Sequence, residues 1–201
     1  VHDKKGIEKL GFNALLAVNS GSAKEPRFIV LEHRGKSISG ATICLVGKTI
    51  TFDSGGLNIK VGDFMTNMKF DKCGGIDVLE IVAAAAALEL PVHVVGLMPA
   101  TENLPSGTAY KVGDIYKGYN GKTMEIGNTD AEGRVILSDA LAYTKTFKPK
   151  AVIDLATLTG ACTVALGHQA AGLMGNNEKL ISKVKDAAAS TGERVWELPM
   201  Y

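Results

Sequence analysis

The sequence predicts an α/β fold in which helices cover both faces of a central sheet. Short apolar runs bounded by Gly, Ser and Pro alternate along the chain with segments of helical composition. The strand-like runs are apolar throughout, which is typical of strands buried on both faces. Of the 201 residues, 46% are hydrophobic and 21% charged, a composition that excludes a disordered chain.

Five strands are expected, each a compact apolar run that a turn-forming residue ends. They span residues 13–18, 28–31, 41–46, 92–98 and 151–156. The run at 41–46 ends at Gly47, and the run at 92–98 follows Pro91 directly. Residues 50–52 are extended in character as well.

Three helices are expected between and after these strands, at 76–90, 135–147 and 179–190. The first contains five consecutive alanines and ends at Pro91, and the second stops before Pro149. Repeats, low-complexity tracts and linkers are lacking in the sequence. We therefore expect one folding unit.

Charge and cysteine usage exclude several classes of protein. The chain has 22 Lys and Arg against 21 Asp and Glu, a net charge of +1, which gives no field to attract nucleic acid or an anionic membrane. Its three cysteines are scattered, as expected of buried thiols in a reducing compartment. The longest apolar run, residues 81–88, is too short to span a bilayer, so we expect a soluble protein. Because the chain begins with Val1, we treat it as a candidate piece of a longer protein.

Glycine is over-represented, with 23 residues, or about 11% against a usual 7%. A loop-rich α/β protein explains this, and so does a site where backbone approaches a ligand closely. Two Gly-Lys-Thr tripeptides, at 47–49 and 121–123, are not phosphate loops, because Thr42 and Tyr116 stand where the preceding glycine is required. Histidines and cysteines form no zinc-site spacing, so any metal site must consist mainly of carboxylates.

Acidic residues occur where apolar runs meet glycine-containing turns, in three segments. Asp53 lies in residues 47–56, Asp71 in 68–75, and both Asp130 and Glu132 in 128–134. Strand ends are where α/β proteins assemble their sites. Four carboxylates at three strand ends exceed what helix capping requires, and they can hold two metals when some of them bridge.

The third of these segments admits several interpretations. Asp130, Glu132 and Arg134 are spaced two apart, which places them on one side of an extended chain. Either Arg134 or a divalent cation could offset the repulsion between the two carboxylates. A helix beginning near Gly133 would let its N-terminus and Arg134 hold an anion, whereas a solvated turn that caps the helix is the ordinary alternative. Lys48 and Lys60, which flank Asp53, are either solvated, metal ligands or cations that polarise a substrate; the residues alone do not decide.

Four motifs in this sequence resemble those of the leucyl aminopeptidase (cytosol aminopeptidase) family. The heptapeptide Asn-Thr-Asp-Ala-Glu-Gly-Arg at 128–134 is similar to the motif by which that family is identified. Gly-Lys-x-x-x-Phe-Asp-Ser-Gly-Gly at 47–56, Met-Lys-Phe-Asp at 68–71 and Leu-Ala-Thr-Leu-Thr-Gly-Ala at 155–161 occur in the family's order and spacing. Departures at Lys72 and at Gly74-Gly75 lie beside Asp71 and affect no residue to which the resemblance gives a role.

The resemblance implies a three-layer α/β sandwich with a mixed, largely parallel central sheet, incomplete at its C-terminal end. Residues 1–201 would be the core of the catalytic (peptidase) domain, forming one domain. An N-terminal domain and the C-terminal end of the catalytic domain would be absent.

The resemblance also implies a centre of two divalent metal ions, zinc or manganese. Asp53 and Glu132 would bridge both metals, Lys48 and Asp71 would complete one, and Asp130 the other. Lys60 would polarise the scissile carbonyl, and Arg134 would hold a bicarbonate ion as general base. Met68, Thr157 and Gly160 would line the pocket for the first side chain of the substrate.

The implied function is a metalloprotease that removes N-terminal residues, preferring Leu and other apolar ones, from peptides with a free N-terminus. The family resemblance further implies a cytoplasmic homohexamer with no membrane association. DNA binding, a secondary role in some members, is not supported by the net charge of +1. The alternatives are a non-catalytic assembly or regulatory homologue, in which the site residues should have decayed, and a fragment inactive through truncation.

Overall fold

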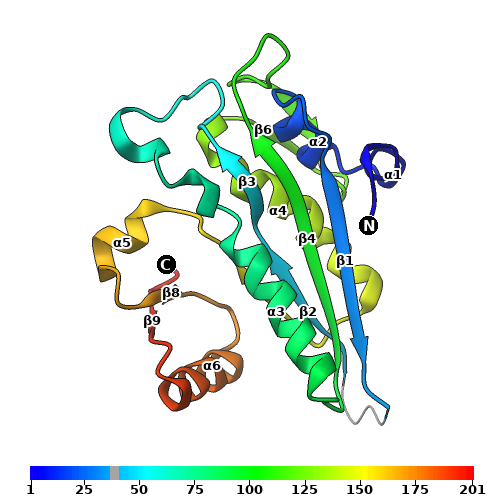
Figure 1. The fold of residues 1–201 in the computed structure, drawn as a ribbon, viewed down its shortest axis with the longest axis vertical. Coiled ribbons are helices and arrows are strands. Elements are labelled where there is room, and N and C mark those ends of the chain that lie inside the picture. Colours follow the sequence, from blue (N-terminus) through cyan, green and yellow to red (C-terminus); the bar gives the residue numbers. More distant parts are fainter. Residues whose placement is uncertain (37–40) are drawn as a thin grey trace. The chain divides into compact units, whose positions relative to one another are not determined.

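The computed structural model describes residues 1–36 and 41–201. These residues form two compact units, Val1–Leu158 and Thr159–Tyr201. The larger unit contains a five-stranded sheet with its covering helices, and the smaller unit contains two helices and a short two-stranded sheet (Figure 1). The expectation of a single catalytic-domain core stays a prediction.

The sheet of the larger unit is mixed and mostly parallel, as expected. Its strands run in the order β1-β4-β2-β7, and β3 pairs with the C-terminal part of β4, residues 100–103. Strand β1 is antiparallel to β4, whereas the β2–β4, β2–β7 and β3–β4 pairs are parallel. The strands are β1 (Arg27–Arg34), β2 (Ile43–Gly47), β3 (Thr49–Asp53), β4 (His93–Asn103) and β7 (Ala151–Leu155), and a separate hairpin pairs β5 (Ile115–Lys117) with β6 (Thr123–Glu125).

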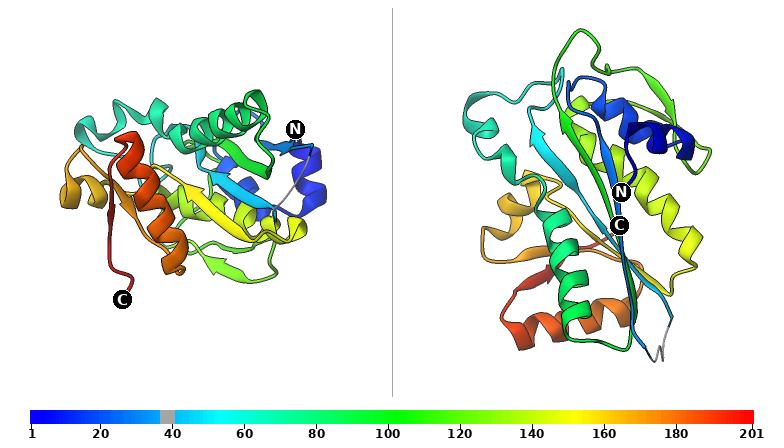
Figure 2. Two further views of the ribbon diagram at one scale, coloured as in Figure 1. Left: turned by 90° about the horizontal axis from the view of Figure 1, so that it is seen from below. Right: turned by 45° about the vertical axis from the view of Figure 1, so that its right-hand side comes forward.

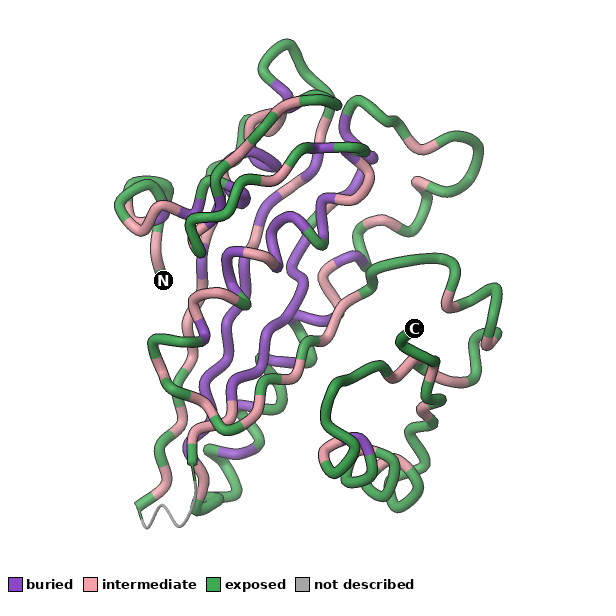
Figure 3. Tube along the Cα trace, turned by 180° about the vertical axis from the view of Figure 1, so that it is seen from behind, coloured by how far each residue is buried: buried purple, intermediate pink, exposed green. Residues whose placement is uncertain are grey.

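Helices cover both faces of this sheet, which confirms the predicted layers. Helix α3 (Cys73–Ala87) packs on one face, whereas α2 (Asn13–Asn19) and α4 (Glu132–Tyr143) pack on the other (Figure 2). Alternate residues of the strands serve the two cores: Leu45 packs with Val78 of α3, and Val46 packs with Ile136 of α4. The buried positions concentrate along these strands (Figure 3). The remaining elements of this unit are α1 (Lys4–Leu10) and the 3-10 helices η1 (Gly62–Met65), η2 (Met68–Phe70), η3 (Thr129–Ala131) and η4 (Thr144–Phe147).

Strands β2 and β3 are one strand interrupted at a single residue, Lys48. Val46 pairs with Leu97 and Thr49 with Ala100, so the register along β4 is unchanged across the interruption. The backbone of Lys48 still donates a hydrogen bond to the Leu155 carbonyl (3.0 Å). The interruption therefore places a lysine at the middle of the sheet without breaking its ladder.

Part of the glycine excess is explained at the start of α3, where the helix backbone approaches the neighbouring strands closely. A Cβ atom on Gly74 would lie 1.9 Å from the carbonyl oxygen of Leu155, and one on Gly75 would lie 2.2 Å from the Thr49 hydroxyl. Only glycine fits at such distances. The first turn of α3 can therefore begin against the strand ends, directly after Asp71.

The predicted strand at 13–18 is wrong, because this segment is helix α2. The Asp139 carboxylate of α4 accepts hydrogen bonds from the backbone N–H groups of Ala14 (2.9 Å) and Leu15 (3.1 Å), which pairs the free donors of the first turn of α2. A short run that is apolar throughout fits a buried helix as well as a buried strand, so periodicity could not separate them.

The other predicted elements of the larger unit are confirmed, with shifted ends. The helix expected at 76–90 begins at Cys73 and ends at Ala87, and the helix expected at 135–147 is α4 followed by η4. The strand expected at 92–98 continues to Asn103. That extension carries β4 as far as the end of β3.

The smaller unit consists of α5 (Gly160–Leu166), β8 (Ala171–Leu173), α6 (Glu178–Thr191) and β9 (Val195–Glu197), with β8 parallel to β9. The helix expected at 179–190 is α6. Its first turn is capped by the Asn177 side chain, which accepts a hydrogen bond from Leu180 N (3.1 Å), and its end by Gly192 at φ 79°. Within the described parts of the chain, no helix has the length and apolar character needed to cross a membrane.

Candidate metal centre

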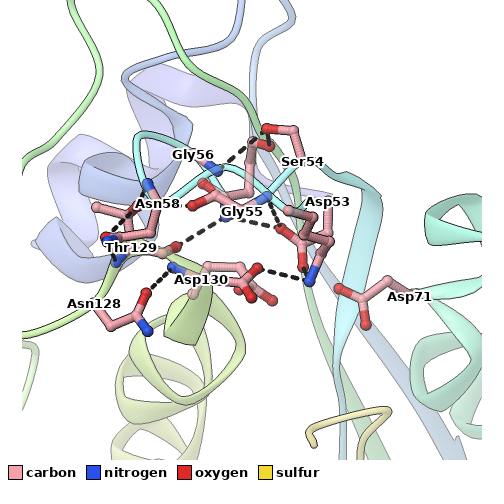
Figure 4. A network of polar contacts seen from close by, with 12 residues as sticks. Asp53, Ser54, Gly55, Gly56, Asn58, Asp71, Asn128, Thr129 and Asp130 are labelled. Carbon is pink, nitrogen blue, oxygen red and sulfur yellow. Dashed lines mark hydrogen bonds and ion pairs between the residues drawn. The ribbon is translucent and has the colours of Figure 1, made fainter. Parts of the chain in front are cut away.

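Four carboxylates and two lysines meet beside the C-terminal end of β3. Asp53 is the last residue of β3, and Asp71 lies between η2 and α3. Asp130 is in η3, and Glu132 is the first residue of α4. Figure 4 shows Asp53, Asp71 and Asp130 directed towards a common space. The fold thus gathers residues that lie far apart in the sequence. Of the positions expected at strand ends only that of Asp53 is confirmed, because Asp71 follows the 3-10 helix η2, and Asp130 and Glu132 lie in η3 and α4.

Lys48 occupies the more deeply buried half of this cluster. Its Nζ lies 2.7 Å from Asp71 Oδ1 and 2.8 Å from Glu132 Oε1, and it donates to the Thr157 carbonyl (2.8 Å). The Thr157 hydroxyl donates to Asp71 Oδ1 (2.8 Å). Lys48, Asp71 and Glu132 are 3%, 5% and 1% exposed. Charges at this depth are tolerated only when they are paired.

Lys60 occupies the more open half. Its Nζ lies 2.9 Å from Asp53 Oδ2 and 2.6 Å from Asp130 Oδ1. The Asp53 side chain is buried, whereas that of Asp130 is 32% exposed. The loop that carries Lys60 is fixed by its own backbone, since Lys60 N donates to the Ser54 carbonyl (2.9 Å). Each lysine therefore bridges two carboxylates, and the cluster as a whole keeps an excess of negative charge.

The residues present fit a divalent metal. One carboxylate oxygen from each of Asp53, Asp130 and Glu132 lies within 4.8 Å of the others. Asp71 Oδ2 and Glu132 Oε2 are buried and have no hydrogen-bond partner in the described ranges. A buried carboxylate oxygen without a partner costs free energy, and a hard divalent cation is a ligand that would remove this cost.

Burial and mutual repulsion shift the pKa values of this cluster. Burial raises the pKa of Glu132 to about 7, even though Lys48 favours its charged form. Burial also raises the pKa of Asp71. For Lys48, burial acts to lower the pKa, but the carboxylates of Glu132 and Asp71 outweigh it and raise the pKa above its ordinary value. Lys48 is therefore an ammonium in this arrangement, and acting as a metal ligand would require it to give up that proton.

Arg134 forms no ion pair with the carboxylates among the described residues, so of the two groups that could offset their repulsion the divalent cation remains. Arg134 is exposed and lines a cavity of about 280 Å³ together with Asn128 and Ala131. The extended geometry predicted for Asp130, Glu132 and Arg134 is wrong, because the segment coils through η3 directly into α4. In the described structure it is Lys48 and Lys60 that pair with the carboxylates of this segment.

The three residues expected to bind the substrate lie in different places. Met68 is half-buried at the start of η2, just before Asp71. Thr157 follows β7 and contacts both Lys48 and Asp71. Gly160 begins α5 in the smaller unit, and its expected role stays a prediction.

Sequence reasoning missed Asn103 and Thr129, which are both fully buried beside the carboxylates. The Asn103 side-chain amide donates to Asp53 Oδ1 (2.8 Å) and to the Thr129 carbonyl (3.0 Å). The Thr129 hydroxyl donates to the Gly55 carbonyl (2.7 Å) and accepts from Asn58 N (2.8 Å), which joins the two site loops (Figure 4). Asn103 escaped the rule that found Asp53, because the strand was expected to end at residue 98 whereas β4 continues to Asn103.

Comparison with known proteins finds one family. The family model described as "Cytosol aminopeptidase family, catalytic domain" matches residues 1–201, the whole chain. Proteins named "Probable cytosol aminopeptidase" are 55% identical in Geobacter sulfurreducens, 52% in Geobacter sp. strain M21 and 50% in Cenarchaeum symbiosum. The matches cover 98–100% of this chain but 40–41% of those relatives, so the chain spans about two fifths of their length. The chain therefore belongs to the cytosol aminopeptidase family.

Proposed function

We propose that this chain carries the catalytic centre of a metal-dependent aminopeptidase, which hydrolyses the first peptide bond of peptides with a free N-terminus. The observation that carries the proposal is the convergence of four carboxylates and two lysines, with two buried carboxylate oxygens left unpartnered among the described residues. Membership of the cytosol aminopeptidase family and the names of the relatives support it.

The proposed centre holds two divalent metals, zinc in the first place and manganese as the alternative. Asp53 and Glu132 would bridge them, with Asp71 and Lys48, the latter after loss of its proton, on one metal and Asp130 on the other. Bound there, the metals would supply an activated water and a Lewis acid for the scissile carbonyl. Glu132 fits a bridging position because its Oε1 faces Lys48 while its Oε2 has no partner in the described residues.

Lys60 is the proposed electrophile among the protein's own groups. Burial acts to lower its pKa, but hydrogen bonds to Asp130 and Asp53 raise it above the ordinary value, so the side chain stays charged at neutral pH. Its side chain is 14% exposed, at the open half of the centre, where a substrate can approach. A fixed ammonium at this place would stabilise the oxyanion that develops on the carbonyl.

Arg134 and the start of α4 form the proposed site for a bicarbonate ion acting as general base. Arg134 follows Glu132 by two residues in the sequence, and together with Asn128 it lines the cavity described above. An exposed arginine beside a helix N-terminus favours a small anion. Met68 and Thr157 are the proposed walls for the first side chain, with a preference for leucine and other apolar residues.

The assembly and location remain proposals too, namely a homohexamer in the cytoplasm. The second candidate function, a non-catalytic homologue, predicts decay of the site. Lys48, Asp53, Lys60, Asp71, Asp130, Glu132 and Arg134 are instead all retained. A fragment that keeps these residues but is inactive through truncation is distinguished by comparing its activity with that of the full-length parent.

The test uses the full-length parent protein, its metal content and its hydrolysis of leucine p-nitroanilide. We expect two bound metals and turnover in wild type, and loss of turnover in Asp71→Ala. The matched control is Glu80→Gln, an exposed carboxylate on α3, which should change neither. Full activity in Lys60→Ala and Glu132→Ala would contradict the proposal, and two bound metals without any peptidase activity would favour the non-catalytic homologue.

A further inference from the structure

Asn103 ends β4 at the point where the segments of two proposed metal ligands come together. One hydrogen of its side-chain amide goes to Asp53 Oδ1 (2.8 Å), and the other goes to the carbonyl of Thr129 (3.0 Å), the residue before Asp130. Its own backbone carbonyl accepts from Ser54 N (3.0 Å) and from the Ser54 hydroxyl (2.8 Å). We propose that Asn103 is a positioning residue of the metal centre, which sets the separation between Asp53 and Asp130 through one amide group.

The orientation of the amide follows from its partners. A carboxylate oxygen and a backbone carbonyl both only accept hydrogen bonds, so the nitrogen of Asn103 must face them. The amide oxygen of Asn103 is then directed towards Gly56, since a Cβ atom added to Gly56 would lie 2.9 Å from it. This oxygen has no hydrogen-bond partner in the described ranges. A fully buried amide oxygen without a partner is costly. That the protein bears this cost indicates that the two N–H donors of the Asn103 amide are needed.

These donors decide which oxygen of Asp53 is available. Asp53 Oδ1 accepts from Asn103 and from Gly55 N (2.9 Å). Two N–H donors on one oxygen leave Oδ2 to face Lys60 and the other carboxylates. Without Asn103, Oδ1 would keep only the Gly55 donor. The carboxylate would then be less restrained about its terminal torsion, and the metal-facing oxygen would be less firmly positioned.

The second arm of the amide fixes the other loop. The Thr129 carbonyl accepts from Asn103 and from the Tyr110 hydroxyl (2.7 Å), so it is held from two sides. Because Asp130 follows directly, the position of this carbonyl sets the position of the carboxylate. Asn103 contacts both segments through one buried amide group, and the inference rests on the proposed metal-dependent function of this site.

Asn19 offers a matched control for a merely structural role. It is also a buried amide, and its Nδ2 donates to the Lys24 carbonyl (2.8 Å) and to the Thr101 hydroxyl (3.0 Å) near the same end of β4. It therefore makes as many side-chain hydrogen bonds as Asn103, but none to a site carboxylate. Leucine at either position keeps the branched shape and removes both donors.

The experiment compares full-length wild type, Asn103→Leu and Asn19→Leu. The readouts are the dissociation constant for Zn²⁺ or Mn²⁺, from competition with a chelator, and the melting temperature of the metal-free protein. We expect both variants to melt earlier than wild type. Only Asn103→Leu should bind metal more weakly, by about 10- to 100-fold, as is usual when a partner of a metal ligand is removed. Its kcat should fall while KM changes little.

Asn103→Ser replaces Asn103→Leu in this comparison if the leucine variant does not unfold cooperatively. Serine keeps one hydroxyl donor, so this variant should lose less metal affinity. Wild-type metal affinity in a folded Asn103 variant would overturn this inference, and so would an equal loss in Asn19→Leu. A wild-type protein that binds no metal would overturn the proposed function together with it. Two metals bound equally by wild type and the Asn103 variant would overturn the inference alone.

Discussion

Helix α4 buries two carboxylates, and the two have opposite surroundings. Glu132 begins the helix and is 1% exposed; Asp139, two turns later, is 0% exposed. Asp139 accepts three backbone hydrogen bonds, from Ala14 N (2.9 Å), Leu15 N (3.1 Å) and Tyr119 N (2.8 Å). Glu132 faces a lysine with one oxygen and leaves the other without a partner in the described residues.

The difference separates two uses of a buried charge. The hydrogen bonds of Asp139 all go to backbone, so it fastens α2 and the segment at Tyr119 to α4 and serves the fold. Glu132 lies among other carboxylates and keeps an unused oxygen, so it is free to bind a cation. Burial alone does not identify a functional carboxylate. What identifies it is the part of its bonding capacity that the protein leaves unused.

The largest expected effect is that of Glu132→Gln on activity. Replacing the proposed bridging carboxylate by a neutral amide should weaken metal binding and lower kcat/KM by about 10³-fold or more, because the metals contribute several kcal/mol to the transition state. The melting temperature without metal should fall less than in Asp139→Asn, because Lys48 keeps Asp71 and the Thr157 carbonyl as partners and the glutamine oxygen can still accept its hydrogen bond. Kinetics and melting of the same preparation test this. Retained activity would place Glu132 with the structural carboxylates.

Asp139→Asn should show the reverse pattern. The amide can turn its oxygen towards only some of the three N–H donors, so the variant loses charge-assisted hydrogen bonds and should be destabilised by about 3 kcal/mol. Chemical denaturation measures this loss. The folded fraction should keep wild-type metal content and KM; a large fall in metal affinity with unchanged stability would remove the contrast between the two carboxylates.

Metal removal sharpens the comparison further. A ligand that binds only the folded state stabilises it by about 2.7 kcal/mol when its free concentration is 100 times its dissociation constant. We therefore expect a chelator to lower the melting temperature of wild type and of Asp139→Asn by similar amounts. The same chelator should leave Glu132→Gln nearly unaffected, and differential scanning calorimetry with and without metal decides the point.

Much of the fold and the set of charged site residues could be predicted because both depend on local patterns. Apolar runs located the strands of the main sheet, and an acidic residue at the end of such a run gave Asp53. Asp71 was also expected at a strand end, but its segment forms the 3-10 helix η2. The strand assigned to residues 13–18 failed because Asp139, more than a hundred residues away, satisfies the donors of helix α2. Asn103 was missed because its role depends on contacts with Asp53 and Thr129, which only the folded chain brings together.

The smallest effect, a pH dependence, tests the structural carboxylate by itself. Burial raises the pKa of Asp139 above its ordinary value of 3.8, more than the hydrogen bonds from Tyr119, Leu15 and Ala14 lower it. The folded state then binds this proton more tightly than the unfolded state does. The contribution of Asp139 to stability should therefore grow as the pH falls from neutral through the folded-state pKa towards 3.8.

The other raised carboxylates act in the same direction, so the measured quantity is the difference between the unfolding free energies of wild type and Asp139→Asn, both free of metal. It should increase on acidification by about 1.4 kcal/mol for each unit by which the two pKa values differ. A difference that stays flat would mean that the three N–H donors offset burial completely. A difference that falls on acidification would mean that the three N–H donors outweigh burial. The folded state would then hold Asp139 as a carboxylate, with its pKa below the ordinary value.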